Sequence, residues 1–144
     1  QRDAADIYYA GGDVRGGSGV IVLPCGAGKT IVGIAVMALL QRSTLVLTTS
    51  EFGRTPGISS ELGRDHWPNA WSVTLAGCGI AGGAVVGATN EDGTAITERM
   101  VTPADLHHTY YRALGIDPHK TYTVGARPVY LADESASAIH ELFT

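Results

Sequence analysis

The fold of this chain is predicted from Leu23-Pro24-Cys25-Gly26-Ala27-Gly28-Lys29-Thr30, a glycine-rich stretch that lies between two apolar segments. The segment before it, 20–23, reads Val-Ile-Val-Leu, a β-branched run typical of a buried parallel strand. In the segment after it, 31–40, every residue except Gly33 is apolar, and the length favours a buried helix over a second strand. The sequence therefore predicts a strand, a loop and a helix in succession.

A loop of this composition predicts phosphate binding. Gly26 and Gly28 allow a tight turn that directs successive N–H groups toward one point, at the positive end of the following helix. Lys29 would reach the outer phosphates, and the Thr30 hydroxyl would bind Mg²⁺. Leu23 stands where the usual G-x-x-x-x-G-K-[ST] pattern has its first glycine, a mild departure. The predicted phosphate-binding residues are Pro24, Cys25, Gly26, Ala27, Gly28, Lys29 and Thr30. The alternative is a glycine-rich turn that only connects a strand to a helix.

Length and composition indicate one globular domain spanning residues 1–144, with 17% charged and 44% apolar residues. The net charge of −4 argues against a nucleic-acid partner, whose binding surfaces are normally basic. No apolar run reaches the length of a membrane span, and we expect neither a signal peptide nor a membrane partner. Cys25 and Cys78 lack metal or redox spacing, so a cytoplasmic location is expected.

The segment 44–49, Thr-Leu-Val-Leu-Thr-Thr, predicts a second strand. With 20–23 and the intervening helix it would form one parallel βαβ unit with a right-handed crossover. The predicted fold class is therefore α/β, a three-layer sandwich with a largely parallel sheet. Such a sheet leaves edges and apolar faces that a second copy of the chain could cover, so a homo-oligomer is left open.

The first third of the chain resembles a known family. The resemblance is carried by Gln1-Arg2, by 15–30 (Arg-Gly-Gly-Ser-Gly-Val-Ile-Val-Leu-Pro-Cys-Gly-Ala-Gly-Lys-Thr) and by 44–49. These segments resemble the start of an XPB-type superfamily 2 DNA helicase. The resemblance implies that Gln1 and Arg2 contact adenine, and that the loop holds ATP, ADP or phosphate with Mg²⁺. The sequence has no Asp-Glu-x-His box, no Ser-Ala-Thr motif and no second domain with arginine fingers, so binding without efficient hydrolysis is expected.

The rest of the chain resembles a different family. The segments 50–56 (Ser-Glu-Phe-Gly-Arg-Thr-Pro), 63–70 (Gly-Arg-Asp-His-Trp-Pro-Asn-Ala), 101–106 (Val-Thr-Pro-Ala-Asp-Leu) and 113–118 (Ala-Leu-Gly-Ile-Asp-Pro) carry this likeness. They resemble the C-terminal part of the sulfatase-like domain of unknown function 1501, a relative of the alkaline phosphatases. The chain thus resembles a chimera joined near 48–50, with the strand 44–49 serving both halves. A chimeric fold with no activity is an alternative function.

A remnant metal-dependent phosphatase or sulfatase-like hydrolase is the other alternative. By resemblance, His66 falls at a ligand position, and Glu51 falls where relatives carry Asp followed by His. Phe52 follows Glu51 here, which removes one ligand and leaves at most Glu51, Asp65 and His66. A catalytic zinc needs about three protein ligands and an open position. Zinc or another divalent metal, apart from Mg²⁺ with a nucleotide, is therefore not expected.

Other segments predict local structure. Thr102, Pro103 and Asp105 have the spacing of a helix N-terminus, and Gly115 would end that helix. Asp92-Gly93 predicts a hairpin turn. Further expected elements are helices at 2–9 and 136–143 and strands at 72–77, 84–87 and 127–131. Without a metal, Arg54, Arg64 and Asp65 would form a surface cluster of salt bridges.

Overall fold

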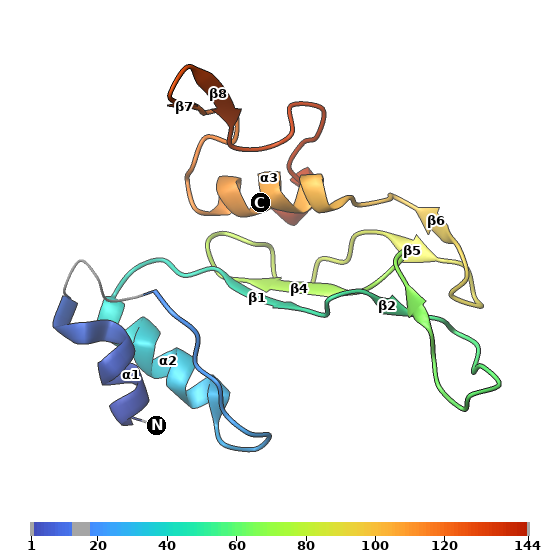
Figure 1. The fold of residues 1–144 in the computed structure, drawn as a ribbon, viewed down its shortest axis with the longest axis horizontal. Coiled ribbons are helices and arrows are strands. Elements are labelled where there is room, and N and C mark those ends of the chain that lie inside the picture. Colours follow the sequence, from blue (N-terminus) through green and yellow to red (C-terminus); the bar gives the residue numbers. More distant parts are fainter. Residues whose placement is uncertain (1, 13–17, 144) are drawn as a thin grey trace. The chain divides into compact units, whose positions relative to one another are not determined.

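The computed structural model describes residues 2–12 and 18–143 (Figure 1). The chain divides into two compact units, Gln1–Thr44 and Leu45–Thr144, which are described separately. None of the helices among the described residues is both long enough and apolar enough to cross a bilayer.

The described part of the N-terminal unit consists of two packed α-helices, α1 (Arg2–Tyr9) and α2 (Lys29–Leu40), with a 3₁₀ turn, η1 (Ala10–Gly12), after the first. Both α-helices were predicted, and both are confirmed. Their contact buries Ala5 and Val32, which are 1% and 2% exposed. This unit therefore has a small core in which each helix contributes one fully buried side chain.

The predicted strand at 20–23 is wrong. These residues are irregular, and Val20 and Val22 are 89% and 86% exposed. A strand needs a neighbour to accept and donate its main-chain hydrogen bonds, and the described part of this unit contains no second strand. The predicted parallel βαβ unit with its right-handed crossover is therefore wrong as well.

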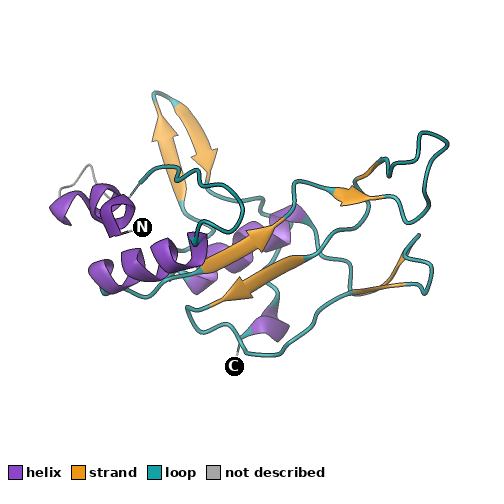
Figure 2. Cartoon of the chain, turned by 90° about the horizontal axis from the view of Figure 1, so that it is seen from below, coloured by secondary structure: helices purple, strands orange, loops and turns teal. Residues whose placement is uncertain are grey.

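Across residues 45–143, the C-terminal unit contains four separate two-stranded antiparallel sheets (Figure 2). The pairs are β1 (Val46–Thr49) with β4 (Val73–Ala76), β2 (Gly53–Arg54) with β3 (His66–Trp67), β5 (Ala88–Thr89) with β6 (Ile96–Glu98), and β7 (Thr121–Val124) with β8 (Arg127–Tyr130). This topology contradicts the predicted three-layer sandwich with a largely parallel sheet. The strands at 46–49, 73–76 and 127–130 lie within the predicted segments, but they pair antiparallel, so the predicted parallel pairing is wrong.

The longest sheet pairs Val46 with Ala76 and Thr49 with Val73. The segment 44–49 therefore does form a strand, yet its partner is the later strand β4, which runs antiparallel to it. The predicted strand at 84–87 is wrong, because these residues are irregular and pairing begins at Ala88, directly after them. The predicted hairpin turn is confirmed: Asn90 Oδ1 accepts the N–H groups of Thr94 and Ala95 at 2.7 and 3.0 Å.

Helix α3 (Pro103–Ala113) has the ends that its sequence predicts. Thr102 Oγ1 accepts the Asp105 N–H, and Asp105 Oδ2 accepts the Thr102 N–H, which together form a capping box. At the other end Gly115 has φ +70°; its N–H donates to Arg112 O, while the Ile116 N–H donates to Tyr111 O. These two bonds form a Schellman motif, in which glycine is favoured because its φ is positive.

The C-terminal segment packs along α3 without forming the helix predicted at 136–143. The described residues there contain only a 3₁₀ turn, η2 (His140–Leu142), and a bridge between Ile80 and Phe143. The core of this unit lies where this segment meets α3, and its buried side chains are His108, Thr109, Ala138 and Ile139.

Candidate functional site

The predicted phosphate-binding loop forms a compact turn that leads directly into α2. Residues 25–27 make the turn, and Gly26 and Gly28 have φ of +77° and +81°. Gly28 is the N-cap of α2, and its carbonyl accepts the N–H groups of Ile31 and Val32 at 3.0 and 3.2 Å. Both glycines adopt the left-handed conformation, which is unfavourable for residues that carry a side chain.

The first N–H groups of α2 have no acceptor within the helix, because the first turn of any α-helix lacks preceding carbonyls. Lys29 and Thr30, both exposed, occupy this turn. Lys29 Nζ donates to Pro24 O at 2.8 Å, so the ammonium folds back over the turn. The ammonium and the first main-chain donors of α2 thus lie at the same end of the helix, and Cys25 is exposed in the turn between Pro24 and Gly26.

Of the two residues that resemblance assigns to adenine, Arg2 lies in the described part of the chain. Arg2 is exposed, and its Nε lies 4.0 Å from Asp6 Oδ2. The two residues are four apart on α1, about one helical turn. Gln1 lies outside the described residues. The assignment of these residues to adenine therefore stays a prediction.

The three metal candidates lie on the surface of the β2–β3 region. Glu51, Asp65 and His66 are all exposed, and the ring of His66 packs 4.1 Å from the ring of Phe52. Within residues 2–12 and 18–143, no group of three or more His, Cys, Asp or Glu side chains is arranged to hold a metal ion. The Phe52 ring, rather than another candidate ligand, is thus the neighbour of the His66 ring.

The arginines beside this region hold the loop together through main-chain carbonyls. Arg64 Nη1 donates to Thr55 O at 2.8 Å and to Pro56 O, and Arg54 Nη1 approaches Arg64 O at 3.4 Å. Arg54 also lies over the Phe52 ring, 5.0 Å from its centre. The arginines therefore stabilise the 55–64 loop through these contacts rather than through the surface salt bridges that the sequence suggested.

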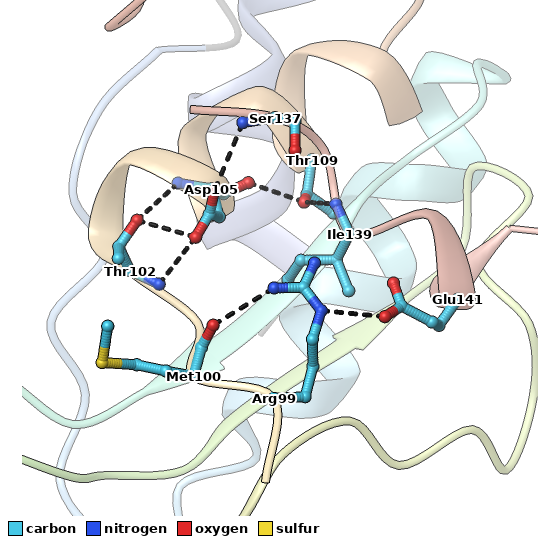
Figure 3. A network of polar contacts seen from close by, with 8 residues as sticks. All are labelled: Arg99, Met100, Thr102, Asp105, Thr109, Ser137, Ile139 and Glu141. Atoms are coloured by element: carbon cyan, nitrogen blue, oxygen red, sulfur yellow. Dashed lines mark hydrogen bonds and ion pairs between the residues drawn. The ribbon is translucent and has the colours of Figure 1, made fainter. Parts of the chain in front are cut away.

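The sequence did not predict the polar network that fixes the C-terminal segment to α3 (Figure 3). Asp105 Oδ1 accepts the Ser137 N–H at 3.2 Å, in addition to its role in the capping box. Thr109 Oγ1 accepts the Ile139 N–H at 3.0 Å. Arg99 pairs with Glu141 at 2.8 Å and donates to Met100 O. The capping-box spacing identified Asp105, but nothing local predicts a partner 32 residues away.

The electrostatics of the network follow from these bonds. Partial burial alone would raise the pKa of Asp105, but the hydrogen bonds from the Thr102 N–H and hydroxyl and from the Ser137 N–H outweigh it, so the pKa of Asp105 lies below its ordinary value. The hydrogen bond between Arg99 and Glu141 raises the pKa of Arg99 and lowers the pKa of Glu141. Burial raises the pKa of the Tyr110 hydroxyl. The carboxylate of Asp105 is thus favoured in its charged form.

Comparison with known proteins identifies relatives of part of the chain. The chain is 58% identical over 50 residues to the DNA 3'-5' helicase XPB of Mycobacterium tuberculosis, a match that covers 35% of this chain and 8% of that protein. The DNA 3'-5' helicase XPB of Kineococcus radiotolerans is 40% identical over 84 residues, which are 58% of this chain and 13% of the relative. The transcription and DNA repair factor IIH helicase/translocase subunit XPB of Antonospora locustae is 59% identical over 39 residues, 27% of this chain and 6% of that protein.

The chain thus spans between 6% and 13% of the length of these relatives. Their names give no support to the expectation, drawn from net charge, that argues against a nucleic-acid partner, because two of these relatives are DNA helicases. No solved structure matches the chain.

A family model matches most of the remaining sequence. The match runs over residues 37–143, so it begins within α2, ahead of the join expected near 48–50. The two resemblances are confirmed: one segment is similar to XPB helicases and a longer one matches a domain family. Because that match covers more than half of the sequence, the chain belongs to the family described as "Protein of unknown function (DUF1501)".

Proposed function

We propose that the 23–30 loop binds the phosphate groups of ATP or ADP, or inorganic phosphate. The observation that carries the proposal is the position of Gly28, whose φ of +81° lets α2 begin at Lys29 directly after the 25–27 turn. The N–H groups of Lys29 and Thr30 are then available at the positive end of a 12-residue helix. A phosphate accepts hydrogen bonds from such donors. The 58% identity to a helicase over 50 residues favours a nucleotide over an unrelated anion.

Lys29 supplies the charge of the site in this proposal. Its ammonium now donates to Pro24 O, a neutral carbonyl. A phosphate oxygen is a stronger acceptor for an ammonium than a carbonyl is, because the phosphate carries a negative charge that attracts the cation. Nucleotide binding would therefore draw Lys29 from Pro24 toward the outer phosphates. Mg²⁺ would arrive with the nucleotide, and the Thr30 hydroxyl would be its protein ligand.

Adenine contacts by Gln1 and Arg2 belong to the same proposal. Arg2 lies on α1, which packs against α2 in the same unit, and Gln1 precedes it in the sequence. Binding without efficient turnover is proposed, because the 144 residues contain no Asp-Glu-x-His box to hold Mg²⁺ and orient water.

The experiment is a calorimetric titration of ATP, ADP and inorganic phosphate, each with and without Mg²⁺, into the full chain. The sequence has two lysines, Lys29 and Lys120, so Lys120→Ala is the matched control for Lys29→Ala. Loss of one hydrogen bond to a charged partner costs about 1.5–3 kcal/mol. Lys29→Ala should therefore weaken ATP binding by about 10- to 100-fold, whereas Lys120→Ala should bind like the wild type.

Each result has one meaning. A specific loss in Lys29→Ala supports the loop as the nucleotide site. Equal affinities of the wild type and Lys29→Ala would remove the loop from any nucleotide binding observed. No binding of any of the three ligands would leave a chimeric fold with no activity as the better description.

A further inference from the structure

The hairpin of β7 and β8 is an exposed sheet whose two strands pair only with each other among the described residues. Every residue of both strands is exposed. Tyr122 pairs with Val129, and Val124 pairs with Arg127, so these four side chains lie on one face of the hairpin. Lys120, two residues before Tyr122, lies on that face too, and its Nζ is 5.0 Å from the centre of the Tyr122 ring. This face therefore combines exposed apolar side chains with two cations.

The charge of this hairpin differs in sign from that of the whole chain. Lys120 and Arg127 are the only Lys, Arg, Asp or Glu residues in the segment 118–132, whereas the chain has a net charge of −4. The flanking carboxylates of Asp117 and Asp133 each accept the N–H of the residue two positions later, at 3.0 and 2.9 Å. The hairpin thus presents local positive charge, which favours a partner that carries carboxylates.

The free edge of β7 has unused main-chain hydrogen-bonding groups. The Leu131 N–H donates to Lys120 O at 3.1 Å, so these two residues form a hydrogen-bonded pair. Hydrogen-bonded and non-hydrogen-bonded pairs alternate along an antiparallel ladder. Thr121 and Thr123 therefore belong to non-hydrogen-bonded pairs, and their N–H and C=O groups point away from β8. They are the groups that a further strand would use.

The free edge of β8 is closed to a further strand by its sequence. Pro128 pairs with Thr123, so it is one of the residues whose main chain faces outward, and proline has no N–H to donate. The β1–β4 sheet has strands of the same length, but neither of them contains a charged residue. Among these edges, β7 therefore combines complete main-chain groups with a charge that selects a partner.

We propose that β7 binds an extended acidic peptide segment of a partner protein, which adds a third, antiparallel strand to the hairpin. Four main-chain hydrogen bonds would join the segment to Thr121 and Thr123. Apolar side chains of the segment would lie opposite Tyr122 and Val124, and a carboxylate would lie opposite Lys120. A peptide fits this edge better than a nucleic acid does, because alternating main-chain donors and acceptors match those of another strand.

The test is an amide NMR titration of the full chain with a capped synthetic octapeptide, Thr-Val-Thr-Val-Thr-Glu-Thr-Glu. Paired antiparallel with β7, this peptide places its valines opposite Val124 and Tyr122 and its first glutamate opposite Lys120. Saturable shifts, largest at the Thr121 and Thr123 amides, are expected. The same peptide with both glutamates replaced by lysine should bind at least about threefold more weakly. Equal affinities of the two peptides would overturn the assigned charge preference.

Two variants separate the edge from the rest of the surface. Lys120→Glu should weaken binding of the acidic peptide by at least about threefold. Arg42→Glu is the matched control, since Arg42 is exposed in the N-terminal unit and its replacement changes the net charge equally. Thr123→Pro removes one outward N–H and no bond within the hairpin, and it should weaken binding about two- to tenfold.

The remaining outcomes also decide the proposal. Cross-strand NMR contacts between Val124 and Arg127 establish that Thr123→Pro keeps the hairpin. Unchanged affinity in that variant, or equal affinities of Lys120→Glu and Arg42→Glu, would overturn the proposal. Thr121 and Thr123 shifts that follow the concentration of the protein alone would assign the edge to a second copy of the chain. Tighter binding of an oligothymidylate than of the acidic peptide at this hairpin would assign it to nucleic acid, and either result would overturn the proposal.

Discussion

The hydroxyl of Thr109 accepts the main-chain N–H of Ile139 at 3.0 Å, and so joins α3 to a segment 30 residues later. The same hydroxyl donates to Asp105 O at 2.7 Å. Thr109 and Ile139 are 0% and 2% exposed, so water cannot replace either bond. This link holds the C-terminal segment at the core of its unit.

Thr109→Val should lower the free energy of unfolding of the C-terminal unit by about 1–3 kcal/mol. The variant keeps the volume of the side chain but leaves the buried Ile139 N–H without an acceptor. Urea denaturation followed by circular dichroism measures the change. Thr123→Val on the exposed strand β7 is the control and should stay within about 0.5 kcal/mol of the wild type. Similar stabilities of the two variants would show that the Thr109–Ile139 bond does not hold the segment.

Asp105→Asn should reduce stability at pH 7 by about 1 kcal/mol, because it weakens the capping box and the bond to Ser137. The folded-state pKa of Asp105 lies below its ordinary value of 3.8. Its carboxylate therefore contributes stability above pH 3.8, and this contribution is lost as pH falls through the lower, folded-state pKa. The difference between variant and wild type should accordingly shrink in acid.

Chemical denaturation at pH 7, 4 and 2.5 tests this dependence. Asp92→Asn is the control, since the Asp92 side chain forms no hydrogen bond in the described part of the chain. A difference between Asp105→Asn and the wild type that stays constant from pH 7 to 2.5 would contradict the assigned role.

Gly53→Ala should destabilise the β2–β3 hairpin strongly. A Cβ at this buried glycine would lie 1.8 Å from Ala70 O and 2.6 Å from Trp67 O, both of which are main-chain atoms. The backbone must shift to admit it, at a cost of about 1–3 kcal/mol or more. Gly57→Ala is the control, because nothing lies within 4 Å of its Cβ position. In thermal denaturation the first variant should melt several degrees below the second, and equal melting temperatures would refute the packing described here.

The parts of the fold that could be predicted are those whose chemistry is local. Thr102, Asp105 and Gly115 lie within or next to α3, and each fixes one end of it through bonds to neighbours in sequence. The hairpin turn around Asn90 is local in the same sense.

The direction of strand pairing could not be predicted, because it depends on residues distant in sequence. The segment 44–49 has strand composition, but nothing within it selects β4 as an antiparallel partner. The run at 20–23 has strand composition as well, and it stays irregular because the described part of its unit offers no strand to pair with. Burial of His108 also depends on a distant contact, with Asp133 O.

In the candidate site, too, the local features could be predicted from the sequence and the long-range arrangement could not. The 23–30 loop was predicted to turn into a helix over 31–40; the turn is present, and the helix begins two residues earlier than predicted, at Lys29. The strand expected ahead of the loop is absent from the described residues. The metal candidates Glu51, Asp65 and His66 come from separate parts of the β2–β3 region, and their exposed positions could not be judged from spacing alone.

The most direct test of the central claim is an amide NMR titration of the full chain with Mg²⁺ and ATP. The account predicts saturable shifts that are largest at the N–H groups of Gly26, Gly28, Lys29 and Thr30, much smaller in Lys29→Ala at the same ATP concentration and kept in Lys120→Ala. Amides that do not shift at these four residues, or shifts of the same size in Lys29→Ala, would contradict it.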